Sequence, residues 1–492
     1  YSAGVALTTG LRNTLLGSTA GDALVGAERN TAVGYGALHT ETEGDRNTAV
    51  GVFALSTQNT TGGGNIYNTA VGYAAGNAVT TGVENTIIGG LAGDALTSGF
   101  ENVVVGKSAL TTDTLGRGST ALGYATLFNQ NFTTATTTQN TAVGYYAGVS
   151  ITTGVENTLI GSLAGDALTD ADRNVAVGVE ALSADTLGSN SVAIGPLALN
   201  NQNFTTATNS YNTAVGANAG TAVTTGIKNT LIGGLAGDAL TEGGQNTVLG
   251  MQTLSTDTKG SETTAIGHTA LFSQNFTTAT NSLNTAVGHE AGYGVTTGPQ
   301  NTLIGNRAGF GSGTATRLTT GTSNTVIGYI ASVTAADGDQ ANVIGASVSG
   351  EGGYTTLGYS SSDIRAANGN VTWATVSDVR YKKDIVDSTA GLSFINALQP
   401  RIFKYKTLGE LPETFNAYEA DSTEVYKNSN TNHGFIAQEV KAAIDADSNI
   451  KDGFKLWDDR DDGSQEVAEA ALIPILVKAI QELTARITTL EG

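Results

Sequence analysis

Four aspartates with the potential for acid–base chemistry recur along the chain exactly 72 residues apart: Asp22, Asp94, Asp166 and Asp238. Two carboxylates that face one groove are the groups that hydrolyse a glycosidic bond. Each of these aspartates, however, lies in the same Leu-Ala-Gly-Asp-like loop, and this regularity indicates a structural role. The chain contains no cysteine, so neither a disulfide framework nor a thiolate metal site is possible. The composition therefore predicts no turnover enzyme and no cofactor.

The elements that position these residues follow from a repeat. The phrase Asn-Thr-apolar-apolar-Gly, or a close variant, occurs 19 times between Gly17 and Gly345. Successive copies are 17 residues apart, except for intervals of 21 residues after Gly51, Gly123, Gly195 and Gly267 and one interval of 23. Three intervals of 17 and one of 21 form a superrepeat of 72 residues. Such periods predict a solenoid, in which each unit adds one short strand.

The strand in each unit is apolar at two consecutive positions, as in Ala32-Val33 and Ile87-Ile88. Consecutive residues of a strand point to opposite faces. We expect the residue before the Gly to fill the core of the roll and the preceding position, mostly Ala, to contact a neighbouring chain. This predicts a homo-oligomer packed along the shaft, with a single-chain β-helix carrying a small-residue stripe as the alternative.

The unit Asn190–Gly195 resembles the head repeat of trimeric autotransporter adhesins of the YadA type, and this resemblance extends over roughly residues 11–348. It implies a trimeric parallel β-roll of about 19 turns. With strands about 4.8 Å apart, the rod is on the order of 90 Å long. We therefore expect a mainly β protein with a repetitive shaft over residues 1–348 and a neck over 349–376.

The composition changes at Ser377, where charged and aromatic residues become frequent. Four blocks in this region, in the same order, resemble the peptidase S74 family, an intramolecular chaperone found at the ends of phage tail spikes and fibres. They are Ser377–Ile385, Phe403–Lys406, His433–Val440 and Leu476–Leu483. The resemblance implies a small α+β chaperone domain over residues 377–492.

This family resemblance also implies a Ser-Lys dyad, Ser377 and Lys382, that cleaves the chain once between Val376 and Ser377. His433 and Gln438 either support this site or only pack and cap a nearby helix. A Ser and a Lys five residues apart do not share a helix face, so a strand or loop must bring them together.

The heptad pattern of the last segment, residues 470–491, predicts a coiled-coil helix with two apolar seam positions. Its seam residues are Ile473, Ile480 and Ile487 at one position and Leu476, Leu483 and Leu490 at the other. Ile at the first position and Leu at the second favours two strands, whereas both family resemblances imply three. We expect a homotrimer.

Together these features predict a structural, receptor-binding fibre of a virus particle of the tailed-phage type, assembled in the host cytoplasm. The Thr/Asn-rich loops 58–67, 129–139, 201–211 and 274–283 are either receptor contacts or simply solvated loops. The chain begins at Tyr1 in mid-pattern, so we expect a missing N-terminal part to join other virion proteins. The net charge of −20 argues against nucleic-acid binding, and no apolar run is long enough to insert into a membrane. The alternatives are a bacterial trimeric surface adhesin and a glycan-depolymerising tailspike.

Overall fold

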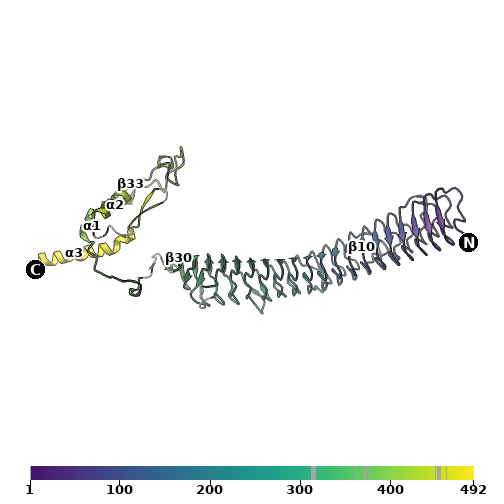
Figure 1. Ribbon diagram of the computed structural model, residues 1–492, viewed down its shortest axis with the longest axis horizontal. Helices are drawn as coiled ribbons and strands as arrows, with labels where there is room; N and C mark the ends of the chain where they lie inside the picture. The colour runs from purple at the N-terminus through teal and green to yellow at the C-terminus, as the bar shows by residue number, and fades with distance from the viewer. Residues whose placement is uncertain are drawn as a thin grey trace. The chain divides into compact units, whose positions relative to one another are not determined.

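The computed structural model describes residues 2–311, 317–360, 362–370, 374–375, 377–448, 450, 456–460 and 463–492. The chain forms two compact units, Tyr1–Val376 and Ser377–Gly492. In the first unit, short strands stack one after another from the N-terminus to β30 (Figure 1).

The first unit is a parallel β-solenoid, which confirms the predicted fold class. Equivalent residues of successive turns pair in register, as Thr14 with Thr31 and Leu16 with Val33. The strands of this main sheet that pair in parallel are β1 Thr14–Leu16, β2 Thr31–Val33, β4 Thr48–Val50, β6 Thr69–Val71, β7 Thr86–Ile88, β8 Val103–Val105, β10 Thr120–Leu122, β12 Thr141–Val143, β13 Thr158–Ile160, β14 Val175–Val177, β16 Val192–Ile194, β18 Thr213–Val215, β19 Thr230–Ile232, β20 Thr247–Leu249, β22 Thr264–Ile266, β24 Thr285–Val287, β25 Thr302–Ile304, β26 Thr325–Ile327, β28 Asn342–Ala346 and β30 Tyr354–Tyr359.

A glycine follows nearly every shaft strand because the next turn lies too close for a side chain. At Gly89 the backbone has φ +140°, and a Cβ atom would stand 2.4 Å from the carbonyl oxygen of Gly106. Only glycine adopts this conformation readily. The glycine column therefore ends each strand and permits the tight stacking of turns.

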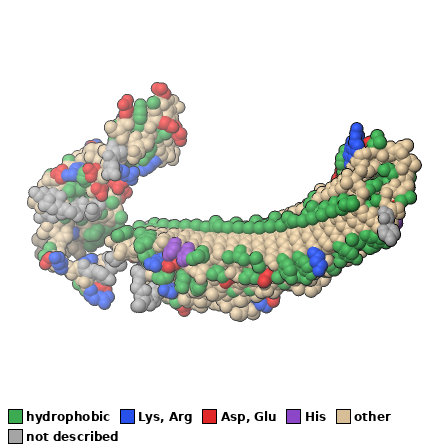
Figure 2. Space-filling view, turned by 45° about the vertical axis from the view of Figure 1, so that its right-hand side comes forward, with side chains coloured by type: hydrophobic (Ala, Val, Ile, Leu, Met, Phe, Trp, Pro, Cys, Tyr) green, Lys and Arg blue, Asp and Glu red, His purple; other side chains and the backbone are tan. Residues whose placement is uncertain are grey.

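The burial of the strand faces is the reverse of what we expected. In β7, Ile87 is fully buried, whereas Ile88 is 38% exposed. The middle position is mostly Ala where a Leu of the second segment fills the core, as Leu38 does beside Ala32. Where the middle position is Ile or Leu, that segment carries Gly, as Gly93 does near Ile87. The residue before the Gly points outward, and exposed hydrophobic side chains form rows along the shaft (Figure 2).

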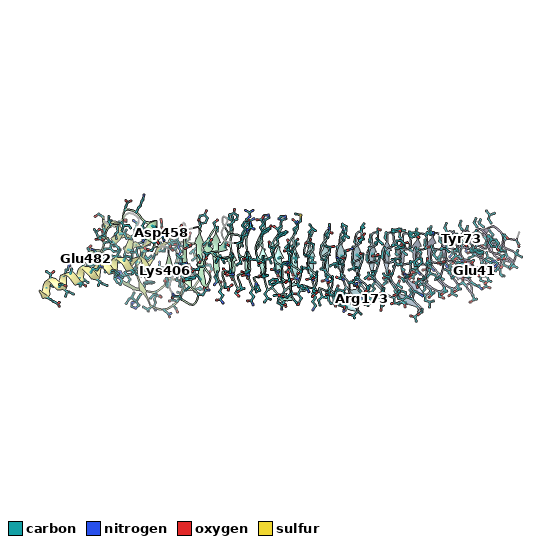
Figure 3. The ribbon with its side chains drawn as sticks, turned by 90° about the horizontal axis from the view of Figure 1, so that it is seen from below. Glu41, Tyr73, Arg173, Lys406, Asp458 and Glu482 are labelled. Carbon is teal, nitrogen blue, oxygen red and sulfur yellow. The ribbon has the colours of Figure 1, made fainter. Side chains whose placement is uncertain are left out.

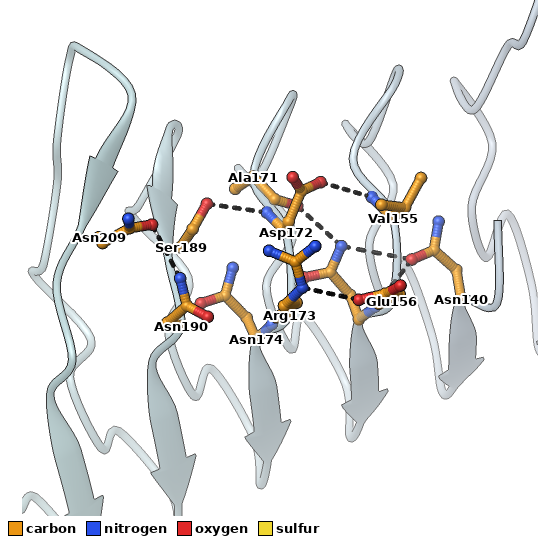
Figure 4. Close-up of polar contacts among 11 residues, drawn as sticks. Asn140, Val155, Glu156, Ala171, Asp172, Arg173, Asn174, Ser189, Asn190 and Asn209 are labelled. Carbon is orange, nitrogen blue, oxygen red and sulfur yellow. Dashed lines mark hydrogen bonds and ion pairs between the residues drawn. The ribbon is translucent and has the colours of Figure 1, made fainter.

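A buried ladder of asparagines holds successive turns together (Figure 4). Asn157 donates its backbone N–H to Oδ1 of Asn140 at 2.9 Å, and its own Oδ1 accepts the backbone N–H of Asn174 at 3.0 Å. Its Nδ2 donates to the carbonyl oxygen of Ala171 at 2.8 Å. The Asn that opens most copies of the phrase thus satisfies backbone groups that would otherwise be buried without partners.

The longer intervals form small side ladders beside the main sheet. Each pairs a two-residue strand before the shaft strand with one in the following loop. These pairs are β3 Gly44–Asp45 with β5 Gly64–Asn65, β9 Gly116–Arg117 with β11 Thr136–Thr137, β15 Gly188–Ser189 with β17 Thr208–Asn209, and β21 Gly260–Ser261 with β23 Thr280–Asn281. Nearer the end of the shaft, β27 (Ser332–Val333) pairs with β29 (Ser349–Gly350).

The regular stacking ends in the predicted neck. There β31 (Ser362–Ala367) pairs antiparallel with β30, and β32 (Ala374–Thr375) pairs antiparallel with β31. The direction of the chain reverses at this point, so no further parallel turn is added.

The second unit contains three α-helices among its described residues: α1 Leu392–Ala397, α2 Ala437–Ala446 and α3 Ile473–Glu491. Two hairpins accompany them, β33 Arg401–Phe403 with β34 Asn432–Gly434, and β35 Trp457–Asp459 with β36 Gln465–Val467. Three 3-10 turns complete the unit: η1 Val379–Tyr381, η2 Leu408–Glu410 and η3 Glu469–Leu472.

The helices of the second unit share a small core, and α3 anchors the others. Phe394, Val440 and Ile475 are buried together in it. Pro474 occupies the first turn of α3, where its missing N–H costs nothing. Glu482 of α3, labelled in Figure 3, accepts the backbone N–H of Leu392 at 2.9 Å and so holds the start of α1.

Candidate functional site

Ser377 and Lys382 lie together at the start of the second unit. Nζ of Lys382 donates a hydrogen bond to Oγ of Ser377 at 2.7 Å. The two residues flank η1, whose N-cap is Asp378: its side chain accepts the backbone N–H of Arg380 at 2.8 Å. The 3-10 turn folds the chain back and brings two residues five apart within reach, as the sequence required.

The surroundings of this pair decide what it can do. Arg380 also donates two side-chain hydrogen bonds to Asp378 and lowers the pKa of that carboxyl group, so the capping carboxylate stays charged. The side chains of Ser377 and Lys382 are both exposed in the single chain. A lysine amine acts as a base only in its neutral form, and burial is the usual means of favouring that form. The two side chains are therefore placed as in a Ser-Lys dyad, but the residues around them do not bury Lys382. Val376 lies outside the described residues.

His433 and Gln438 line a different part of the unit. His433 is on β34 and Gln438 is in the first turn of α2, and both border a pocket of about 740 Å³ whose lining includes neither Ser377 nor Lys382. No side chain caps α2, which begins at Ala437, so His433 is not its cap. Their role in the site stays a prediction.

The four aspartates that recur along the shaft do not form a catalytic pair. They are separated by four turns, or about 19 Å along the shaft, whereas the two carboxylates of glycosidases lie roughly 5–9.5 Å apart. Burial raises the pKa of Asp94, Asp166 and Asp238, and Asp22 lies 2.6 Å from Nδ1 of His39. Oδ1 of Asp94, Asp166 and Asp238 is buried without a hydrogen-bond partner among the described residues. The structural role that their regularity indicated therefore stays a prediction.

A second set of acids, buried at the base of the longer loops, was missed by the sequence analysis. In the third superrepeat, Asp185 is fully buried and its Oδ1 accepts the backbone N–H groups of Gly188 and Phe204, each at 3.0 Å. Its Oδ2 accepts Nε2 of Gln202 at 2.6 Å, and Oε1 of that glutamine accepts Nδ2 of Asn212 at 2.8 Å. This network fixes the base of loop 201–211.

The same arrangement recurs once in every superrepeat. The buried acids with their glutamines are Glu41 with Gln58, Asp113 with Gln130, Asp185 with Gln202 and Asp257 with Gln274. In each pair the glutamine follows the acid by 17 residues, and this spacing is the signal by which they could have been found.

The comparisons with known proteins identify one region of the chain. Residues 377–448 match the peptidase S74 family model, described as the chaperone of endosialidase. The match begins at the Ser377 of the Ser-Lys pair and ends within the described part of the second unit. No curated protein and no solved structure matched the chain. The protein thus joins a β-solenoid to a region similar to an endosialidase chaperone, a combination that suggests a protein like a phage tailspike or fibre.

Two further properties of the described residues bear on function. None of the helices is long and apolar enough to cross a membrane. Within the same residues, no group of three or more His, Cys, Asp or Glu side chains is arranged to hold a metal ion.

Proposed function

We propose that this protein is the receptor-binding fibre of a tailed-phage-type virion, assembled as a homotrimer by a C-terminal chaperone that then cleaves itself from the shaft. One observation carries the proposal: a solenoid shaft is followed directly by a region similar to the endosialidase chaperone, and that region opens with the hydrogen-bonded pair Ser377 and Lys382. The bacterial adhesin has no comparable support. A depolymerising tailspike shares the chaperone match, but the recurring aspartates of the shaft lie too far apart to form its catalytic pair.

Two unpartnered apolar surfaces support assembly from several chains. On the shaft, the outward-pointing residues before the glycines are exposed in many turns: Leu16, Val71, Ile88, Leu122, Ile160, Ile194, Ile232, Leu249, Ile304 and Ile344. On α3 the whole predicted seam is exposed: Ile473, Leu476, Ile480, Leu483, Ile487 and Leu490. Apolar surface in such long continuous rows marks a contact with another protein chain. Parallel copies of the same chain match these rows turn by turn, and the family resemblances imply three of them.

Cleavage follows from the geometry of the pair. Lys382 Nζ in its neutral form takes the proton of Ser377 Oγ, which attacks the carbonyl carbon of residue 376. The peptide bond breaks as the nitrogen of Ser377 leaves with a proton, and an ester joins residue 376 to Oγ. Water then hydrolyses the ester and frees the two parts. The pair is exposed in one chain. Burial of Lys382 by a neighbouring chain would favour its neutral form, so we expect cleavage to follow assembly.

Denaturing electrophoresis of the purified full chain tests the proposal. We expect the wild-type chain to yield two fragments that meet at residues 376 and 377, confirmed by mass spectrometry. Ser377→Ala and Lys382→Arg should remain intact, whereas Lys383→Arg, an exposed neighbour outside the pair, should cleave normally. An uncleaved wild-type chain, or a cleaved Lys382→Arg variant, overturns the Ser-Lys assignment. Sedimentation of the same samples checks the trimer independently.

A further inference from the structure

The only methionine of the chain and half of its histidines occupy three successive turns of the shaft. The chain contains four histidines and one methionine among its 492 residues. Met251, His268 and His289 each follow directly the glycine that comes after a shaft strand, namely β20, β22 and β24. These strands pair in register, so the three residues form one column along the shaft. The proposed cleavage uses none of them.

The backbone holds this column in register and leaves its side chains exposed. The carbonyl oxygen of Met251 accepts the N–H of Thr269 at 3.1 Å, and that of His268 accepts the N–H of Glu290 at 3.0 Å. Met251 is 51% exposed, and His268 and His289 are exposed as well. The two imidazole rings lie almost parallel, with their centroids 5.3 Å apart, and histidine side chains gather on the shaft in Figure 2. The rings are thus neighbours on a rigid support, and no packed core restricts their rotation.

The second superrepeat shows how far a long side chain reaches along this column. There Lys107 and Tyr124 occupy the positions of Met251 and His268, two superrepeats earlier. Nζ of Lys107 lies over the ring of Tyr124, 5.9 Å from its centroid. Met251 is also long and unbranched, so its thioether can turn towards the imidazole of His268 across the same step between turns.

The fold of the shaft does not require these three side chains. The equivalent residues of the third superrepeat are Val179, Pro196 and Ala217. None of their side chains carries an atom that binds a metal, yet the strands there pair in the same register. The ligand atoms of the column are therefore unexplained by the stacking of turns.

The chemical types of the three side chains favour copper in its monovalent form. Thioether sulfur is a soft ligand that selects Cu(I), and imidazole nitrogen suits copper as well as zinc. Zinc sites combine imidazole with thiolate or carboxylate instead. The carboxylate of Glu290 has Oε1 4.0 Å from Nε2 of His289, but its Oε2 accepts Nε of Arg307 at 2.6 Å and is held by that contact. The thioether of Met251 is left as the third ligand.

The hydrogen bonds of His268 favour one ring nitrogen as the ligand. The hydroxyl of Thr269 donates to the carbonyl oxygen of His268 at 2.8 Å. Its oxygen, 3.4 Å from Nδ1 of the ring, is then an acceptor for Nδ1–H, and this favours the tautomer in which Nε2 carries the lone pair. A hydrogen-bond partner on the other ring nitrogen is typical of imidazoles that bind metals.

We propose that Met251, His268 and His289 form a binding site for one Cu(I) ion per chain. The sulfur of Met251 and one nitrogen of each imidazole are the ligands, and the bound ion ties three successive turns together. The site goes beyond the proposed function, because it requires neither the chaperone nor the cleavage.

A competition titration with Cu(I) tests the site. The assembled full-length protein, purified without a polyhistidine tag, competes for the ion with a chromophoric Cu(I) chelator, and we expect one Cu(I) per chain. Loss of a hydrogen-bond partner behind a ligand costs about 10–100-fold in metal affinity, so loss of the ligand itself in His268→Gln or His289→Gln should cost about 100-fold or more. Met251→Leu keeps the size of the side chain and removes the sulfur, and it should weaken binding by about tenfold or more.

Two further measurements read the site without a variant. X-ray absorption at the copper edge should show a sulfur atom bound to the ion in the wild-type protein, so the ligand is identified even where a variant folds poorly. With free Cu(I) at about 100 times the dissociation constant, hydrogen exchange through opening of these three turns should slow by about 100-fold.

His39 provides a matched control on the same shaft. Its side chain is 47% exposed, against 46% for His289, but it lies outside the column. His39→Gln should therefore bind Cu(I) as the wild type does. Absence of Cu(I) binding, no bound sulfur, wild-type affinity in Met251→Leu, an equal loss in His39→Gln, or displacement of Cu(I) by an equal concentration of Zn²⁺ would each overturn the site. Cleavage and sedimentation of the same preparations report separately on the fibre.

Discussion

The adjacent glycines Gly89 and Gly90 allow a sharp test of how the turns are stacked. Gly89 has φ +140°, and a Cβ atom there would lie 2.4 Å from the carbonyl oxygen of Gly106, against an ordinary contact of 3.4–4 Å. Gly90 is outside the left-handed region and a Cβ atom there has no neighbour within 4 Å. Gly89→Ala and Gly90→Ala are therefore the same chemical change at neighbouring residues with opposite structural consequences.

The expected cost at Gly89 has two parts. The backbone conformation costs an alanine about 1–3 kcal/mol. Relief of the contact must also separate the turns by about 1 Å, which weakens hydrogen bonds such as that from Gly106 N–H to the Ile88 carbonyl, now 2.7 Å. Two such bonds, at about 1 kcal/mol each, bring the total to about 3–5 kcal/mol. Gly90→Ala should lie within about 1 kcal/mol of wild type.

Hydrogen exchange measured by mass spectrometry reads this difference turn by turn. Because solenoid turns depend mainly on their nearest neighbours, the loss should be local to the turns around Gly89. An opening free energy lower by about 3–5 kcal/mol accelerates exchange there by about 100-fold to several thousand-fold. Thermal unfolding at one fixed protein concentration provides a second measure. Equal exchange in the two variants would refute the close stacking of turns.

Three further predictions follow from the seam and from two carboxyl groups. Ile480→Glu should shift the protein to smaller species in sedimentation, whereas Thr488→Glu, exposed on α3 outside the seam, should not. Burial raises the pKa of Asp185, so the folded state binds more protons than the unfolded state just above pH 3.8, and acid adds stability through this group. The gap in melting temperature between wild type and Asp185→Asn should therefore widen as the pH falls from 7 towards 4, and a gap that narrows contradicts this reasoning. The Arg307 side chain lowers the pKa of Glu290 below its ordinary 4.5, so that pair stabilises the fold at neutral pH and is lost in acid. Arg307→Ala should accordingly lower the melting temperature more at pH 7 than at pH 3, where only the contact of Arg307 with the Phe310 ring is left to lose.

The sequence predicted the shaft because its period is explicit, but it could not predict which strand face is inside. Ile87 and Ile88 are equally apolar, and nothing in the two side chains tells which of them is buried. Alanine is common at the inner position because a Leu of the second segment often fills the core beside it, whereas we had associated it with a close neighbouring chain. The pattern of two apolar faces was informative, while the size of the residues was misleading.

Part of each candidate site could likewise be predicted from the sequence, and part could not. The family resemblance named Ser377 and Lys382, and the Asp378 cap that folds them together is a recognisable N-terminal signal. The buried acids of the loops were harder to find, because Asp185 looks like any polar residue in a polar loop. Its burial depends on Gln202, 17 residues later, which lies beside it only after the next turn is stacked. Contacts made between turns are invisible to a local reading of the sequence.

The uniformity of the shaft explains why such a protein needs a chaperone at one end. If one chain slips by a whole turn against its neighbours, Ile88 meets the surface meant for Val71 or Val105, a difference of one methylene, or about 0.8 kcal/mol. Only the end turns lose contacts outright, so many registers have nearly equal energy. The correct register must therefore be imposed from outside the repeat. The unit that begins at Ser377 follows the neck after the last turns, and its exposed α3 seam repeats over only three heptads. In the fibre that we propose, chains joined there first are aligned before the shaft closes. The proposed cleavage then separates the aligned shaft from the unit that set its register, and the shaft persists because its turns must be unstacked one by one.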